Sequence, residues 1–103
     1  MIRHIVALRF APEVDAAAKA ALFDALRGLG DHIAGILDFQ AGPNVSVEPL
    51  SRGFDDVFWF DFQDAAARDA YLIDPAHQAI GARLVAATVG GVEGVFVFDL
   101  DLS

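Results

Sequence analysis

The sequence predicts a single α+β domain in which a four-stranded antiparallel sheet carries its helices on one face. Four segments alternate apolar and polar residues as strands do, and the segments between them have helical spacing. They follow one another in the order β-α-β-β-α-β, which is the ferredoxin-like, split β-α-β arrangement. Because 103 residues leave room for one core, we expect residues 1–103 to form one domain.

The first half of the chain is expected to hold a strand, a helix and a second strand. Residues 2–10 alternate with a period of two, which is typical of a strand with one buried face. Asp15 is a suitable N-cap for a helix whose apolar stripe includes Leu22, and glycines end this helix near residue 30. The second strand is expected at about residues 36–41.

The second half repeats this layout. The third strand, residues 54–62, is the most apolar, and a helix is expected over residues 65–72. Asp74 and Pro75 begin a second helical piece, because aspartate is a good N-cap and proline fits the first helical position. Residues 92–102 form the last strand.

Helices on one side of the sheet leave its other face bare. The apolar side chains that we expect on this bare face are those of Ile5, Ala7, Val57, Trp59, Val95 and Val97. Such a surface is too apolar for open water, and the simplest cover is a second copy of the chain packed sheet to sheet. The sequence therefore predicts a homodimer, in agreement with its 55% hydrophobic residues.

Composition excludes several classes of partner. The formal net charge of −8, with Lys19 as the only lysine, disfavours nucleic acid and anionic membranes. No apolar stretch approaches the ~18 residues of a membrane-spanning helix. The absence of cysteine excludes disulfides and thiolate chemistry and favours a reducing, cytoplasmic location.

Two histidines and the only tyrosine are expected to meet between sheet and helices. Strand parity points His4 inward, and helical phase places His77 on the same inward face as Ile80 and Leu84. Tyr71 is the near neighbour of His77 across the helix break. Core histidines are common, but two of them beside a tyrosine in one apolar space suggest a site.

The chemistry available there is proton transfer. His77, near a helix N-terminus, is expected to stay neutral and act as a base. Tyr71 is expected to orient a carbonyl or bind a developing enolate, with His4 as a polar contact. No metal or organic cofactor is needed. The acidic residues of the strands, among them Asp61 and Asp99, are expected to be solvated charge.

Five segments together resemble a known family, namely residues 2–10, 42–48, 53–55, 71–77 and 96–99. In order and spacing they are similar to the stress-responsive A/B barrel (Dabb) domain. The resemblance covers essentially the whole chain. It implies a dimeric α+β barrel, in which two ferredoxin-like subunits are joined through their sheets.

The resemblance also implies roles for particular residues. A plant cyclase of this family closes a polyketide chain by acid–base chemistry, and its catalytic tyrosine and histidine resemble Tyr71 and His77. Its strand-one pocket histidine resembles His4. Asp56 stands where that cyclase has a further pocket histidine, and Asp74 replaces the histidine common before the proline. The substrate-binding candidates are therefore His4, Asp56, Phe58, Ile80 and Leu84.

Three hypotheses remain open at this stage. The protein is a cofactor-free cyclase or isomerase for a small apolar, carbonyl-bearing molecule, a non-catalytic stress or ligand-binding dimer, or a dimer with a filled core. A cavity of about 300 Å³ or more, faced by Tyr71 and His77, separates the first two hypotheses from the third.

Overall fold

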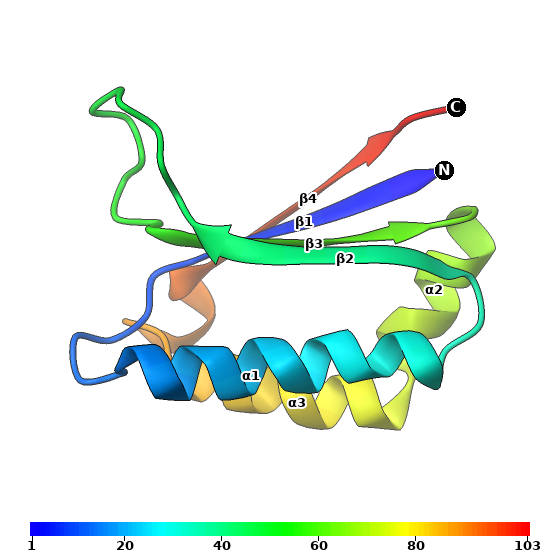
Figure 1. The fold of residues 1–103 in the computed structure, drawn as a ribbon, viewed down its shortest axis with the longest axis horizontal. Coiled ribbons are helices and arrows are strands. Elements are labelled where there is room, and N and C mark those ends of the chain that lie inside the picture. The colour runs from blue at the N-terminus through cyan, green and yellow to red at the C-terminus, as the bar shows by residue number, and fades with distance from the viewer.

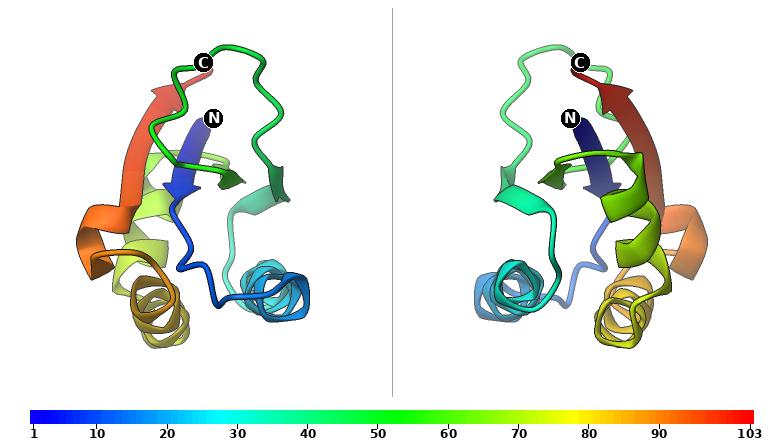
Figure 2. Two further views of the ribbon diagram at one scale, coloured as in Figure 1. Left: turned by 90° about the vertical axis from the view of Figure 1, so that its left-hand side faces the viewer. Right: turned by 90° about the vertical axis from the view of Figure 1, so that its right-hand side faces the viewer.

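A computed structural model describes all residues 1–103 and shows a sheet with every helix on one side (Figure 1). In chain order the elements are β1 (Ile2–Leu8), α1 (Ala16–Gly28), the 3-10 helix η1 (Leu29–Asp31), β2 (Ile36–Pro43), β3 (Asp56–Phe62), α2 (Ala65–Ile73), α3 (Pro75–Ala86), the 3-10 helix η2 (Gly91–Gly94) and β4 (Val95–Asp101). The strands are antiparallel to their neighbours in the order β2-β3-β1-β4. End-on views place α1 beneath the β2 side of the sheet and α3 beneath the β4 side (Figure 2). The predicted ferredoxin-like fold is confirmed.

Each α-helix begins at an aspartate that caps it. The carboxylates of Asp15, Asp64 and Asp74 each accept a hydrogen bond of 2.8 Å from a backbone N–H of the first turn. Such a cap stabilises a helix by about 1 kcal/mol. Pro75 occupies the start of α3, where its missing N–H is not needed. The break between α2 and α3 therefore follows from the Asp-Pro pair, as predicted.

Three strands, β1, β3 and β4, are shorter than the sequence suggests, whereas β2 continues two residues further, to Pro43. β4 begins at Val95 because the residues before it form η2, which Gly90 introduces with a φ of 76°. Between β2 and β3, residues 44–55 contain no strand. We call residues 44–55 the arm; it rises from the end of β2 on the side of the sheet away from the helices (Figure 1).

The register of β4 corrects one expectation about the faces of the sheet. Val6 lies directly opposite Val97, and Ala7 lies opposite Phe96. Residues paired across antiparallel strands share a face, so Val97 and Val95 lie on the inner face, toward the helices. Phe96 and the alternate residues after it lie on the outer, bare face. The prediction that placed Val95 and Val97 on the bare face was wrong, because this strand is apolar on both sides and alternation alone does not orient it.

Aromatic side chains dominate the core between the inner face and the helices. The largest fully buried side chains are Tyr71, Phe60, Phe62, Leu8 and Leu26. The Tyr71 ring lies 5.0 Å from both the Phe60 and Phe62 rings, measured between centroids. Each buried ring of this kind contributes about 1.5–3 kcal/mol to stability, so strand β3 holds Tyr71 in a fixed place.

Candidate functional site

A cavity of about 190 Å³ lies between the inner face of the sheet and the helices α2 and α3. The strands line it with His4, Val6, Phe58, Val95 and Val97. The helices line it with Tyr71, Leu72, His77, Gly81, Leu84 and Val85. The cavity is smaller than the ~300 Å³ that was expected to separate a ligand site from a filled core, so that criterion is not met, although the space is not filled.

Most of the predicted site residues line this cavity, and two do not. His4, Tyr71 and His77 converge there, with Phe58 and Leu84 as apolar walls. Ile80 instead packs against the edge of the hydrophobic core. Asp56 is buried at the far end of β3, where its carboxylate accepts a 2.9 Å hydrogen bond from the Lys19 ammonium.

The helix break brings Tyr71 and His77 together. Tyr71 lies in the last turn of α2, and the backbone N–H of His77 donates to the Asp74 cap at 3.2 Å. The two rings are nearly stacked, with centroids 3.9 Å apart and planes at 31°. The exposed His32 lies with its Nε2 3.2 Å from the other Asp74 oxygen. Asp74 thus fixes the start of α3, and with it the backbone of His77.

The electrostatics of His77 favour a neutral ring. Burial lowers its pKa below the ordinary histidine value, and the nearby carbonyls of Leu72 and Tyr71 only partly oppose this effect. Its Nδ1 is buried without a hydrogen-bond partner. Its Nε2 lies toward Gly81, where an added Cβ would be 3.9 Å away, and Gly81 lines the cavity. Nε2 is therefore the ring nitrogen beside the cavity, and in the tautomer with the proton on Nδ1 it is a hydrogen-bond acceptor and a base.

Tyr71, in contrast to His77, is held in the form that can donate a proton. It is 1% exposed, and burial alone raises its pKa well above the ordinary tyrosine value. The phenol therefore keeps its proton throughout the physiological pH range and is available as a hydrogen-bond donor. The ring also meets His4 edge to face, with centroids 5.7 Å apart.

His4 is oriented by the carboxylate of Asp99, which the sequence predicted to be solvated. His4 and Asp99 are direct partners across β1 and β4, and His4 Nδ1 lies 2.7 Å from Asp99 Oδ1. The other carboxylate oxygen accepts a 2.6 Å hydrogen bond from Arg68 of α2. Burial by itself raises the pKa of Asp99, but hydrogen bonds from Arg68 and His4 outweigh it and lower the pKa. An ionised Asp99 requires the proton on Nδ1, which leaves His4 Nε2 for a ligand.

The expectation that the strand acids are solvated charge was wrong for several of them. Asp61 is 4% exposed and receives two hydrogen bonds, of 2.9 and 3.0 Å, from the Arg3 guanidinium. Asp56 and Asp99 are paired as described above. The available signal was that Asp99 has the inward parity of β4 and lies opposite a buried histidine of β1. No group of three or more His, Asp or Glu side chains is arranged to hold a metal ion.

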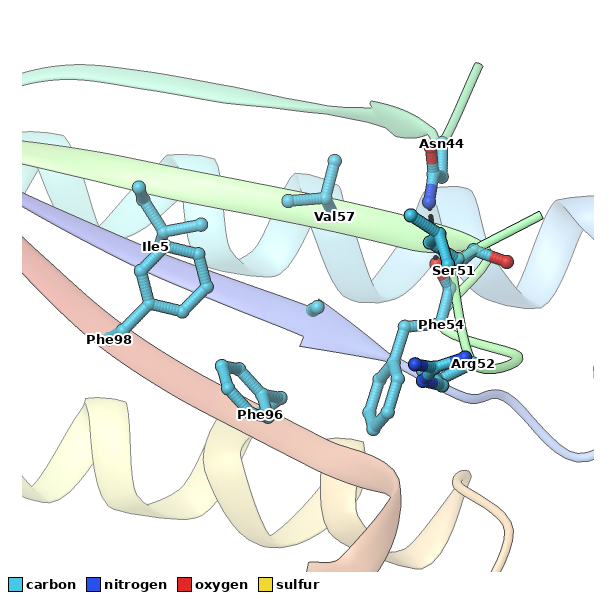
Figure 3. A pocket seen from close by; sticks show the side chains of 10 residues that line it. Ile5, Asn44, Ser51, Arg52, Phe54, Val57, Phe96 and Phe98 are labelled. Carbon is cyan, nitrogen blue, oxygen red and sulfur yellow. Dashed lines mark hydrogen bonds between the residues drawn. The ribbon is translucent and has the colours of Figure 1, made fainter. Parts of the chain in front are cut away.

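A second, larger hollow of about 480 Å³ lies on the outer face of the sheet (Figure 3). Its walls are mostly apolar and include Ile5, Val57, Phe96 and Phe98, with the side chains of the arm at one end. Arg52 is its only charged residue. This hollow has the apolar character of a surface that contacts protein, and it lacks the proton-transfer groups of the inner cavity.

Trp59 has an unsatisfied polar group on the outer side of the sheet. Its indole Nε1 is buried without a hydrogen-bond partner. The Arg3 guanidinium lies over the ring, 4.9 Å from its centroid. A buried N–H without an acceptor is costly, and here it lies on the face that the helices do not cover.

The fold defines a ferredoxin-like domain with a cavity between the inner face of its sheet and its helices. The chain belongs to the stress responsive A/B barrel domain family, whose profile matches residues 2–102. No curated protein sequence matches it. No helix has both the length and the apolar character needed to span a bilayer.

Solved structures share this fold at several levels of identity. A dimeric ferredoxin-like protein of unknown function from Jannaschia sp. CCS1 is 34% identical, with a TM-score of 0.90 and 98% of each chain covered. A protein from Arabidopsis thaliana is 22% identical, with a TM-score of 0.89 over 100% of this chain and 96% of that one. A hydroxynitrile lyase from Passiflora edulis is 16% identical, with a TM-score of 0.83 over 99% of this chain and 94% of that one. The last two likenesses show the fold alone.

Proposed function

We propose that the protein is a homodimer that binds a small, largely apolar, carbonyl-bearing molecule in the inner cavity and moves a proton on it without a cofactor. The observation that carries this proposal is the pairing of His77 with Tyr71. A base kept neutral by burial and a phenol kept protonated by burial lie 3.9 Å apart, ring to ring, on the wall of an apolar cavity. Opposite protonation states in neighbouring groups are what acid–base catalysis needs.

The size of the cavity narrows the substrate. An engineered apolar cavity of roughly 150 Å³ holds one benzene molecule, so about 190 Å³ suits one ring with a short substituent. Phe58 and Leu84 supply apolar walls for such a ring. The histidines and the tyrosine supply the polar contacts that a carbonyl requires.

The proposed reaction is a proton transfer next to the carbonyl. His77 Nε2 takes a proton from the carbon beside the carbonyl, and the electron pair of the broken C–H bond moves to the carbonyl oxygen. The Tyr71 hydroxyl donates a hydrogen bond to that oxygen while it carries negative charge. The His77 imidazolium then returns a proton to carbon, the electron pair moves back from the oxygen, and the C=O bond is restored. A positioned base of this kind accelerates reactions by about 10²–10⁴-fold.

Dimerisation is proposed from the outer face. Phe96, Phe98 and Leu100 are 54%, 47% and 51% exposed on this face, and Trp59 Nε1 is unpartnered there. Ferredoxin-like relatives from Jannaschia, Thermobifida fusca and Bacteroides fragilis are described as dimeric. A second copy packed on this face removes the apolar side chains from water.

The test is hydrogen–deuterium exchange at the methyl group of acetophenone in D₂O, followed by NMR. We expect the protein to accelerate exchange and both His77→Ala and Tyr71→Phe to remove most of the acceleration. His32→Gln, which removes an exposed histidine, is the matched control and keeps it. Melting temperatures within a few degrees of the parent protein show that the fold survives.

Other outcomes decide between the hypotheses. Binding of acetophenone without exchange supports the hypothesis that the protein is a non-catalytic, ligand-binding dimer. A second assay measures cleavage of the hydroxynitrile mandelonitrile, because the Passiflora edulis structure is named a hydroxynitrile lyase. The proposal is overturned if the protein neither binds acetophenone nor catalyses its exchange, or if both variants unfold. Tyr71 and His77 are then core residues.

A further inference from the structure

We propose that the inner cavity selects a carbonyl compound that also carries a hydroxyl group next to the carbonyl, and that Arg68 sets this preference. Arg68 does not line the cavity. It acts through Asp99, which holds His4 as a hydrogen-bond acceptor for the hydroxyl group, so Arg68 is a positioning residue and not a catalytic one. The substrate class rests on the proposed function, whereas the state of the His4 ring is tested separately.

Three polar atoms on the cavity wall have no hydrogen-bond partner within the chain, namely the Tyr71 hydroxyl oxygen, His77 Nε2 and His4 Nε2. The fully buried side-chain atoms without a partner are two others, Trp59 Nε1 and His77 Nδ1. The three atoms of the wall are therefore not sealed in the packed core, and the cavity is the space that their residues share. A ligand in this space has three polar contacts to satisfy.

A plain ketone satisfies only part of this set. Its carbonyl oxygen accepts a hydrogen bond from the Tyr71 hydroxyl, and its acidic C–H group faces His77 Nε2 in the proposed reaction. It has no donor for His4 Nε2, and a polar atom without a partner in an apolar cavity is costly. A hydroxyl group on the ligand supplies this donor. The rings of Tyr71 and His4 have centroids 5.7 Å apart, so we expect one small ligand to contact both, with its hydroxyl group close to its carbonyl.

The hydrogen bonds of Asp99 decide whether His4 Nε2 can accept. His4 Nδ1 lies 2.7 Å from one carboxylate oxygen, and Arg68 donates to the other at 2.6 Å. The neutral ring with its proton on Nδ1 and the charged imidazolium both suit this contact, but only the neutral ring has an acceptor at Nε2. Arginine does not give up its proton, so Arg68 supplies the positive charge that Asp99 needs. A second charge, on the 5% exposed His4, would be buried and would lie close to Arg68.

The side chains around the His4 ring carry no further charge that opposes this balance. They are Phe60 and Phe62 of β3, Tyr71 of α2 and His77 of α3. Burial keeps Tyr71 protonated by raising its pKa and keeps His77 neutral by lowering its pKa. Two carboxylates lie nearby, Asp69 as a second partner of Arg68 and Asp101 further along β4, but both are exposed to water, which screens them. Arg68 and Asp99 therefore determine the charge of His4.

A neutral His4 also favours the proposed base. Burial lowers the pKa of His77, and a charge on His4 lowers it further. Arg68 lies three residues before Tyr71 and on the same side of α2. The helix that carries the hydrogen-bond donor of the site thus also carries the residue that controls its acceptor.

Nitrogen NMR shifts of the His4 ring report its protonation directly, and His4→Gln identifies the signals by their absence. In the parent protein at pH 7 we expect a neutral ring with its proton on Nδ1. Arg68→Met removes the guanidinium and leaves Asp99 with His4 as its partner, so the ring is expected to become mostly imidazolium. Arg68→Lys keeps the positive charge and is expected to restore the neutral ring.

Arg83→Met is the matched control for these spectra. Arg83 is an exposed arginine of α3 that takes no part in the ion pairs of Asp99. Its removal is expected to leave the His4 signals unchanged. The proposal fails if the parent ring is already an imidazolium, if its single proton lies on Nε2, or if Arg68→Met gives the same His4 signals as Arg83→Met.

Ligand binding tests the preference for a hydroxyl group. Phenacyl alcohol, which is acetophenone with a hydroxyl group on its methyl carbon, can donate a hydrogen bond beside its carbonyl, whereas its methyl ether can only accept one. We expect the parent protein to bind the alcohol about tenfold more tightly than the ether, the effect of one hydrogen bond. In Arg68→Met the imidazolium donates to either oxygen, so the ratio of the two dissociation constants is expected to fall by about tenfold. The cost of the extra methyl group is the same in both proteins and cancels in this comparison, which titration calorimetry measures.

The outcomes separate this preference from the proposed function. Selective binding of the alcohol without acetophenone exchange supports the role of Arg68 and contradicts the catalytic function. Acetophenone exchange together with a ratio that Arg68→Met does not change leaves the proposed function standing and overturns the role of Arg68. If the parent protein binds neither compound, the substrate class is wrong, and the His4 spectra still decide what Arg68 does.

Discussion

The two faces of the sheet are both hollowed, but they differ in size and in chemistry. The outer hollow measures about 480 Å³ and has one charged residue, Arg52, on its rim. The inner cavity measures about 190 Å³ and contains two histidines and a tyrosine. The larger space therefore has fewer titratable side chains. The side chains that line each space, and not its volume, distinguish the two faces.

The same strands produce both faces because their side chains alternate. In β1, His4 points inward and Ile5 points outward, and β4 follows with Asp99 inward and Phe98 outward. The helices cover only the inner face, where burial lowers the pKa of His77 and raises the pKa of Tyr71. The outer face has aromatic side chains and an orphaned Trp59 N–H, which suit contact with another protein.

The largest expected effect is on the outer face. Phe98→Glu places a charge in the proposed dimer interface, where a buried charge without a partner is strongly unfavourable. We expect the dimer dissociation constant to rise by at least about 30-fold, corresponding to roughly 2 kcal/mol for a central interface residue. Sedimentation equilibrium measures the change.

The control for this variant is Val92→Glu, which adds the same charge at an exposed position of η2, away from the outer face. It is expected to leave the dimer intact. Equal dissociation of both variants would show that net charge, and not the outer face, governs assembly. A Phe98→Glu protein that remains a tight dimer would place the interface elsewhere.

Asp99→Asn tests the inner face through its ion pairs. Loss of the carboxylate that bonds His4 and Arg68 is expected to lower the free energy of unfolding by about 1–3 kcal/mol at pH 7. Because the folded pKa of Asp99 is lowered, this stabilisation is complete above the ordinary carboxyl pKa and is lost progressively as the pH falls from about 4 through the lower folded pKa. Urea unfolding at pH 7 and pH 3.5 measures it. A difference between parent and variant that persists unchanged at pH 3.5 would contradict the assignment.

Much of this architecture follows from the sequence, because the signals are local. The Asp74-Pro75 pair places the helix break, and strand parity with helical phase brings His4 and His77 to one cavity. The role of Asp99 and the face of Val97 depend on how β4 is aligned with β1. That alignment is a long-range property, and a strand that is apolar on both sides does not reveal it.

The size of the cavity and the exposure of the arm are further properties of packing. Ile80 has the right helical phase but packs toward the core instead of the cavity. Asp56 has the right strand parity but lies at the far end of the strand, beside Lys19. Helical phase and strand parity predict the direction in which a side chain points. The position of the residue along its helix or strand decides which other side chains it contacts.

His77 should give the inner face a pH dependence that the outer face lacks. Its folded pKa is lowered, so the unfolded chain takes up the proton first as the pH falls through about 6.5. The free energy of unfolding then decreases, by at most about 1.4 kcal/mol per pH unit, until the lower folded pKa is reached. We expect His77→Gln to remove this decrease between pH 8 and pH 5.5, while His32→Gln keeps it. Parallel curves for parent and His77→Gln would show that the site does not desolvate this ring.

The smallest expected effect is that of Gly81→Ala, which should change the free energy of unfolding and the rate of exchange in opposite directions. A Cβ at Gly81 meets only His77 Nε2, at 3.9 Å, which is ordinary contact. Gly81→Ala in the interior of α3 is therefore expected to raise the free energy of unfolding by about 0.5–1 kcal/mol. The same methyl group takes space in the cavity beside the proposed base, so acetophenone exchange should become slower. Gly28→Ala, in α1 with no atom within 4 Å of the added Cβ, is the matched control and leaves exchange unchanged. A Gly81→Ala protein that is more stable and equally active would show that the ligand does not approach Nε2.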